Sequence, residues 1–223
     1  MNFDFDLRPS DSPFVESVWR TYSVGGGSFI SSAASHWEMV LTKQKGKITF
    51  SIRGPETKAS PAPIPTDAEF LGIIFKRGAF MPQLPKSDLV NGAVHLTGPT
   101  RDSFSLYGET LQFPDFENAD TFVNQLIRKQ MLAQDNVVDD ILRGQTRDLS
   151  LRSIQRRFLY VTGLTHKAIQ QIERARHALT LLKSGVPIPE TAYQSGYYDQ
   201  PHLTRSLKLF AGQTPAEILK SNQ

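Results

Sequence analysis

Two stretches of the chain share one pattern, SLRSIQRRFLYVTGLTHKAI at 150–169 and DQPHLTRSLKLFAGQTPAEI at 199–218. They align without a gap at an offset of 49 residues. The identical pairs include Arg156/Arg205, Gly163/Gly212, Thr165/Thr214 and Ile169/Ile218. Ser150 and Asp199 are residue types that cap helices well, and a glycine is typical of the point where a helix ends. Each copy therefore predicts a capped amphipathic helix, a glycine stop and a further short element.

The second copy is preceded by a segment that predicts a short helix. Residues 188–197, IPETAYQSGY, indicate a helix that ends at Gly196, and a turn then leads to the Asp199 cap. Ala192 and Gly196 are small where two helices must approach closely. A short helix, a glycine-containing turn and a second helix predict a helix-turn-helix.

The first copy departs from this pattern. The same alignment places Arg143 and Arg147 where the second copy has its two small residues. We expect residues 137–142 to form the supporting helix, followed by a longer turn over 144–149. The sequence does not fix the geometry of this first helix-turn-helix.

One long helix is predicted between the two copies. Residues 167–184 place apolar side chains along one side, over roughly 25 Å at about 1.5 Å per residue. Two helices on such a connector would enter successive major-groove segments, which recur about 34 Å apart.

The front half of the chain has the pattern of β structure. Strands are predicted at 36–42, 47–53 and 70–75, and a hairpin at 103–107 and 110–113, from apolar alternation or continuous apolar runs. The proline-rich stretch 60–65 predicts a loop, because proline cannot occupy a central strand. We therefore expect a small antiparallel sandwich or barrel.

A helical period replaces this pattern at Asn118. We expect the helix at 118–132 to join the two parts, and packing on the β-domain's own sheet is an equal alternative. The predicted fold is α+β with two domains: a β-rich sandwich or barrel-like domain at 1–117, a connecting helix at 118–135, and an all-α domain at 136–223. The last has two helix-turn-helix units joined by a long helix.

Composition and charge limit the classes of function that the chain can have. Residues 1–135 carry 13 Lys+Arg against 15 Asp+Glu, net −2, and residues 136–223 carry 12 against 7, net +5. Most basic residues of the second part are arginines, which suit phosphate and guanine. The chain has no cysteine, which excludes disulfides, thiol catalysis and Cys-ligated metals. With no secretory signal and no membrane-length apolar run, a cytoplasmic location is expected.

The tandem pattern resembles the AraC/XylS family of bacterial transcription regulators. The matching residues run from Ser150 to Phe158 with Gly163, and continue with Ala192, Gly196, Tyr197, Asp199, Gln200, His202, Leu203, Thr204, Arg205, Phe210, Gly212, Thr214 and Pro215. The resemblance implies a two-unit DNA-binding domain and a role in transcription regulation. For the front half it implies a β-rich domain that senses a small molecule, mediates dimerisation, or does both.

Base-reading residues are expected near the N-terminal ends of the two reading helices. The candidates are Arg152, Gln155, Arg156, Gln200, Pro201, His202, Thr204 and Arg205. Arginine can clamp guanine and glutamine can pair with adenine. Arg156 and Arg205 are the best candidates because they are equivalent in the two copies. The competing interpretations are phosphate contact, a solvated surface and packing on the preceding helix. Arg157 is expected to pair with an acidic neighbour, and Phe158, Tyr197 and Phe210 to lie in the core.

The predicted function is sequence-specific double-stranded DNA binding by a transcription regulator, controlled by a small-molecule effector at the front domain. The alternative is a small-molecule-binding or enzymatic β-domain with a helical protein-interaction module. We expect no enzyme activity, no metal and no cofactor. The expected partners are promoter or operator DNA, RNA polymerase, an effector and a second copy of the chain, but no membrane. The apolar aromatics suited equally to a pocket and to a core are Trp19, Trp37, Phe70, Phe75 and Phe80.

Overall fold

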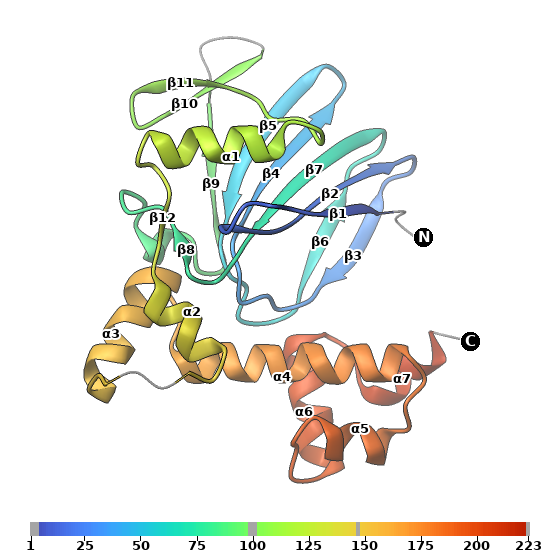
Figure 1. Ribbon diagram of the computed structural model, residues 1–223. Helices are drawn as coiled ribbons and strands as arrows, with labels where there is room; N and C mark the ends of the chain where they lie inside the picture. The colour runs from blue at the N-terminus through green and yellow to red at the C-terminus, as the bar shows by residue number, and fades with distance from the viewer. Residues whose placement is uncertain (1–4, 98–101, 146–147, 222–223) are drawn as a thin grey trace. The chain divides into compact units, whose positions relative to one another are not determined.

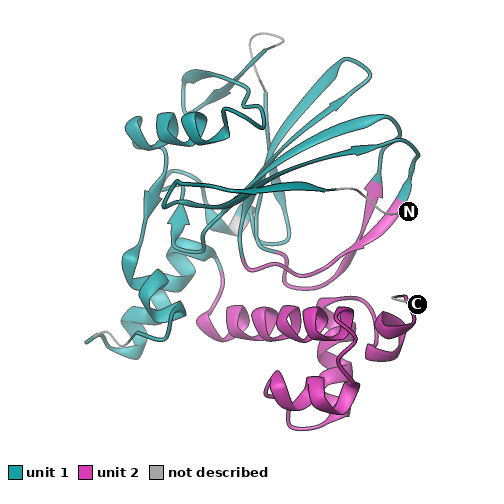
Figure 2. Cartoon of the chain, turned by 45° about the vertical axis from the view of Figure 1, so that its right-hand side comes forward, with its two compact units in different colours: residues 1–27, 36–55, 64–163 teal, residues 28–35, 56–63, 164–223 magenta. Residues whose placement is uncertain are grey.

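The computed structural model describes residues 5–97, 102–145 and 148–221. The chain forms two compact units (Figure 2). Unit 1 contains residues 1–27, 36–55 and 64–163, and unit 2 contains residues 28–35, 56–63 and 164–223. Two short segments of the front half therefore belong to the unit that holds the last helices. The domain boundaries expected from the sequence stay a prediction.

Unit 1 is built on a six-stranded antiparallel sheet in the order β1-β2-β7-β4-β5-β9 (Figure 1). The strands are β1 (Asp6–Pro9), β2 (Val15–Ser23), β4 (Glu38–Gln44), β5 (Lys47–Arg53), β7 (Ala68–Phe75) and β9 (Ala93–Leu96). The apolar run at 70–75 predicted a buried strand, and β7 lies inside the sheet between β2 and β4, which confirms it. The β4–β5 turn is Lys45-Gly46, with φ of 48° and 75°.

Three two-stranded sheets accompany the large one. They pair β10 (Ser103–Leu106) with β11 (Glu109–Gln112), β12 (Ala133–Gln134) with β8 (Ala79–Phe80), and β3 (Gly27–Ser31) with β6 (Ser60–Ile64). The first is the predicted hairpin. The third corrects the loop predicted at 60–65. Pro61 and Pro63 are two residues apart, so their missing N–H groups fall on one edge of a strand that has a partner only on the other.

The core of unit 1 lies between the large sheet and α1 (Ala119–Arg128). Phe50 of β5 is fully buried, and its ring centroid lies 4.8 Å from Phe104 of β10 and 6.2 Å from Phe122 of α1. Burial of a phenylalanine side chain contributes about 1.5–3 kcal/mol. The helix predicted after Asn118 is therefore present and packs on the sheet, as the alternative interpretation expected; its linking role stays a prediction.

The remaining helices of unit 1 are η1 (Lys86–Asp88), α2 (Asn136–Leu142) and α3 (Leu151–Thr162). Unit 2 contains α4 (His166–Lys183), α5 (Ile188–Gln194), α6 (Gln200–Phe210) and α7 (Pro215–Lys220). The long predicted connector is α4. The helix expected at 118–132 is shorter in the structure, since α1 ends at Arg128 and the two-residue strand β12 follows at Ala133–Gln134. The β-rich N-terminal and helical C-terminal regions confirm the predicted fold class. Among the described residues, no helix is long and apolar enough to cross a membrane.

Asp120 ties the start of α1 to the sheet edge. Its carboxylate accepts hydrogen bonds from the Ser10 hydroxyl and from Arg8 Nη1, the latter at 2.7 Å. Burial raises the pKa of Asp120, but the Ser10 and Arg8 hydrogen bonds and the Arg8 charge outweigh it, so the pKa lies below its usual value.

We expect the Asp120–Arg8 pair to stabilise unit 1 at neutral pH and to lose this effect in acid. A lowered pKa in the folded state gives stability above the unfolded-state pKa, near pH 4, and this stability is lost as the pH falls through the folded value. Asp120→Asn should remove that part of the pH dependence, worth less than about 1 kcal/mol because the pair is partly exposed. Denaturation followed by tryptophan fluorescence at pH 6 and pH 3 measures it. Asp11→Asn, at an exposed position, is the control and should change nothing.

Candidate nucleic-acid interface

The second helix-turn-helix is α5 and α6, held together by a small apolar core. Leu203 and Leu207 of α6 are fully buried and pack with Ala192 of α5 and Tyr197 of the turn. The Tyr197 hydroxyl lies 2.7 Å from Ser206 Oγ. Burial raises the pKa of this phenol, opposed by the Ser206 hydrogen bond and the Arg174 charge. Ala192 is therefore small where the two helices meet, as the sequence predicted.

The first half of α6 presents several of its residues to solvent. Asp199 caps the helix by accepting from the His202 N–H at 2.7 Å. Gln200, Pro201 and Arg205 are exposed. Within the described part of the chain, the Arg205 side chain makes no ion pair or hydrogen bond. Packing against the preceding helix does not account for an arginine in that position.

Two other predicted residues of α6 are engaged within the unit. The His202 ring stands edge-on to the Tyr197 ring at 5.0 Å, and the Thr204 hydroxyl donates to the Gln200 carbonyl at 2.9 Å. Both side chains are partly buried. They are less available to a duplex than Arg205.

The first helix-turn-helix is α2 and α3. The Asp135 carboxylate caps α2 by accepting from the N–H groups of Val137 and Val138, and its other oxygen lies 2.7 Å from Arg157 Nη1 of α3. This is the acidic neighbour predicted for Arg157. Arg143 ends α2 and pairs with Asp139 at 2.6 Å, so it does not occupy a helix–helix contact. Arg147 lies outside the described residues.

The solvent face of α3 repeats that of α6. Ser150 caps it by accepting from the Ser153 N–H. Arg152, Gln155 and Arg156 are exposed, whereas Phe158 is fully buried. Neither α3 nor α6 contains an acidic residue, so both faces carry net positive charge, as phosphate binding requires.

Two exposed aromatic residues were not among the DNA-contact candidates predicted from the sequence. Tyr193 of α5 and Tyr198 of the turn are 81% and 93% exposed. Tyrosine hydroxyls are among the groups that contact DNA phosphates. The sequence gives little sign of their exposure, because the neighbouring Tyr197 is a core residue, 7% exposed. Phe210 was also expected in the core, and it packs against the core partly buried.

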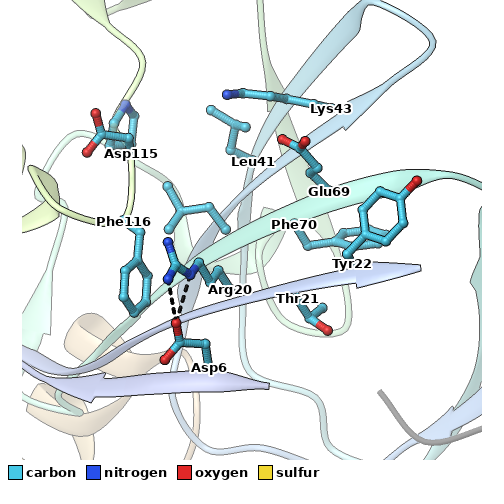
Figure 3. Close-up of a pocket in the computed structure, with 12 residues that line it drawn as sticks. Asp6, Arg20, Thr21, Tyr22, Leu41, Lys43, Glu69, Phe70, Asp115 and Phe116 are labelled. Atoms are coloured by element: carbon cyan, nitrogen blue, oxygen red, sulfur yellow. Dashed lines mark hydrogen bonds and ion pairs between the residues drawn. The ribbon is translucent and has the colours of Figure 1, made fainter. Parts of the chain in front are cut away.

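Unit 1 contains a cavity of about 650 Å³ on one face of the large sheet (Figure 3). Leu41 and Leu71 form an apolar floor, and Phe116 lies at one side. Arg20 pairs with Asp6 at 2.7 Å, and its guanidinium lies 4.3 Å from the Phe116 ring centroid. Of the five aromatics considered as pocket or core, only Phe70 lines this cavity; Trp37, Phe75 and Phe80 are buried in the core.

Residues 146–221 match the protein-family model described as "Helix-turn-helix domain". They form an AraC-type helix-turn-helix domain. The protein is a DNA-binding transcription regulator, as the sequence predicted.

Other comparisons give only weak likenesses. A comparison with curated proteins finds no match. Among solved structures, ToxT K231A from Vibrio cholerae is 11% identical with a TM-score of 0.46, covering 97% of this chain and 100% of that one. Another ToxT crystal form is 12% identical with a TM-score of 0.44, covering 97% and 98%. Fatty-acid-bound ToxT is 11% identical with a TM-score of 0.41, covering 96% and 94%.

The contacts that Asp135 makes with α2 and with Arg157 lead to one prediction. Asp135→Ala removes both the cap of α2 and the partner of Arg157, so we expect unit 1 to lose about 0.5–2 kcal/mol of stability. Urea denaturation followed by tryptophan fluorescence measures it. Asp139→Ala, which removes an acidic side chain from the first turn of the same helix and its ion pair with Arg143 but leaves the cap in place, is the matched control; an equal loss in both variants would contradict the role of the cap.

Proposed function

We propose that this regulator reads two half-elements of duplex DNA, one through α3 and one through α6. The observation that carries the proposal is the repetition of one design. Each helix has a side-chain N-cap, a buried apolar side and an exposed arginine at the same place in the repeat, Arg156 and Arg205. An exposed arginine on the solvent face of such a helix suits the major groove, where it clamps guanine O6 and N7.

The residues proposed to read bases are Arg152, Gln155, Arg156, Gln200, Pro201 and Arg205, with His202 and Thr204 in lesser roles. Pro201 has no side-chain donor, so it offers only apolar contact, such as that with a thymine methyl. Tyr193 and Tyr198 are proposed as phosphate contacts.

Selection from random duplex DNA by the full-length chain, near physiological salt, tests this proposal. We expect a motif with two half-elements about one helical turn apart. Affinity for the selected duplex should fall steeply as salt rises, because phosphate contacts release counterions. A helical domain that served only protein interaction would enrich no motif at any salt.

We further propose that a small molecule in the unit 1 cavity controls the regulator. Its volume lies within the range of about 300–1,000 Å³ typical of ligand sites, and its apolar floor with charged groups at the rim suits an amphipathic molecule. The effector changes DNA affinity only if it binds the competent and incompetent arrangements differently. RNA polymerase and a second copy of the chain are further expected partners.

A thermal-shift screen of metabolites tests the cavity. A ligand at 100 times its Kd adds about 2.7 kcal/mol to stability. Lys43→Trp places a large ring at the exposed rim and should abolish the shift. Lys47→Trp, exposed at the start of β5 and away from the cavity lining, should keep it. Equal shifts in both variants would place the ligand elsewhere.

A further inference from the structure

The C-terminal end of α6 is bonded to two segments from the front half of the chain. These ribbon segments, 28–35 and 56–63, belong to unit 2 (Figure 2). The Ala33 N–H donates to the Phe210 carbonyl at 2.7 Å, and the Ala59 N–H donates to the Leu209 carbonyl at 2.8 Å. The last carbonyls of a helix have no partner within it, so the ribbon segments supply partners that α6 itself lacks.

Side chains reinforce this attachment. Gly212, at φ +74°, ends the helix region, and a Cβ on it would lie 2.6 Å from Ile30 Cγ2 and 3.3 Å from Ala59 Cβ. The glycine therefore allows the ribbon segments to approach closely. Ser35, which is buried, donates from its hydroxyl to Glu173 of α4 at 2.5 Å.

The end of α3 has a similar attachment inside unit 1, made by a different segment. Gly163 is the repeat equivalent of Gly212, and a Cβ on it would lie 2.7 Å from Val90 Cγ2. One turn earlier, the Tyr160 ring stands edge-on to Phe80 of β8 at 5.4 Å. Lys86 Nζ lies 5.9 Å from the Tyr160 ring centroid.

We propose that Ile30 and Val90 are positioning residues for DNA reading, Ile30 for α6 and Val90 for α3. Neither touches the face that carries the predicted base readers; each acts through the glycine that ends its helix. Along the chain, the segment 28–35 is followed by β4, which begins at Glu38. The proposal rests on the proposed function, in which each helix reads its own half-element.

A disulfide tests the attachment of α6 without reference to DNA. The Cβ atoms of an Ile30→Cys/Gly212→Cys pair would lie 3.8 Å apart, about the mean of ~3.8 Å for disulfides, and the natural chain has no cysteine. We expect oxidation to cross-link the full chain, and neither single variant to do so. The cross-linked protein should keep its affinity for the selected duplex within about tenfold of its reduced form, about 1.4 kcal/mol. No cross-link, or a larger loss on oxidation, would overturn the proposal.

Variants of Ile30 and Val90 test whether each residue positions only its own helix. Ile30→Ser should relax base discrimination by about two- to tenfold at the half-element that Arg205→Ala identifies, and Val90→Ser at the half-element that Arg156→Ala identifies. Each variant is the control for the other. An equal loss on all sequences, relaxation at both half-elements or no change would overturn the proposal. If the unaltered chain selects no motif, the proposed function fails, while the cross-link still reports the contact.

Discussion

Leu203→Ala is expected to unfold the second helix-turn-helix more readily than any change on its surface. Leu203 is fully buried in α6 and belongs to the cluster that joins α4, α5, α6 and α7. Truncation of a buried leucine costs about 2–5 kcal/mol, because the lost apolar burial is accompanied by a cavity. Unit 2 should therefore lose much of its stability, and specific DNA binding should weaken with it.

Two spectroscopic signals separate this effect from a general loss of stability. The only two tryptophans, Trp19 and Trp37, both lie in unit 1. The urea midpoint measured by helical circular dichroism should fall in Leu203→Ala, while the midpoint measured by tryptophan fluorescence should change far less. Leu209→Ala makes the same chemical change on the same helix at a position 51% exposed, and we expect it to cost within about 0.5 kcal/mol. Equal costs at both positions would contradict this account of the core.

Local chemistry explains what the sequence could predict. The repeat, the caps Ser150 and Asp199 and the glycine stops depend on interactions within a few residues, and all are present. The strand β7 was readable because it has a partner on both edges and most of its residues are buried, which leaves a nearly continuous apolar run at 70–75. The pairing of Arg157 with an acid was predictable from its place on α3, although the sequence did not identify Asp135.

Long-range contacts explain what the sequence could not predict. Nothing in residues 28–35 or 56–63 indicates that they would join the unit of the last helices, because the bonds from Ala33 and Ala59 use backbone N–H groups. The strand at 60–64 was not predicted, because the prolines were taken to exclude a strand. Proline is excluded only from central strands, and an edge strand with one open side accepts it. The cavity is likewise formed by residues distant in sequence, from Asp6 to Phe116.

Arg205→Ala is expected to relax sequence recognition without destabilising the protein. The side chain is exposed at the middle of α6, on the sixth of its eleven residues, and can reach base edges that the helix backbone cannot. Loss of a bidentate contact to guanine should cost about 1–3 kcal/mol of specific binding, with discrimination lost at one base position. Affinity for the selected duplex and for its single-base variants, measured by fluorescence anisotropy with the full chain, tests this.

The pattern of the loss distinguishes base reading from phosphate binding. If Arg205 reads a base, the Arg205→Ala protein binds the selected duplex and the duplex altered at that one base pair with equal affinity. The salt dependence of binding then stays nearly unchanged. If it holds a phosphate, affinity falls for every sequence alike, and the salt slope drops by about 1. Lys208→Ala removes another exposed cation from α6, towards its far end, and should leave discrimination intact at every position. A uniform loss in Arg205→Ala would therefore assign Arg205 to the DNA backbone and leave the reading of that half-element to Gln200 and Pro201.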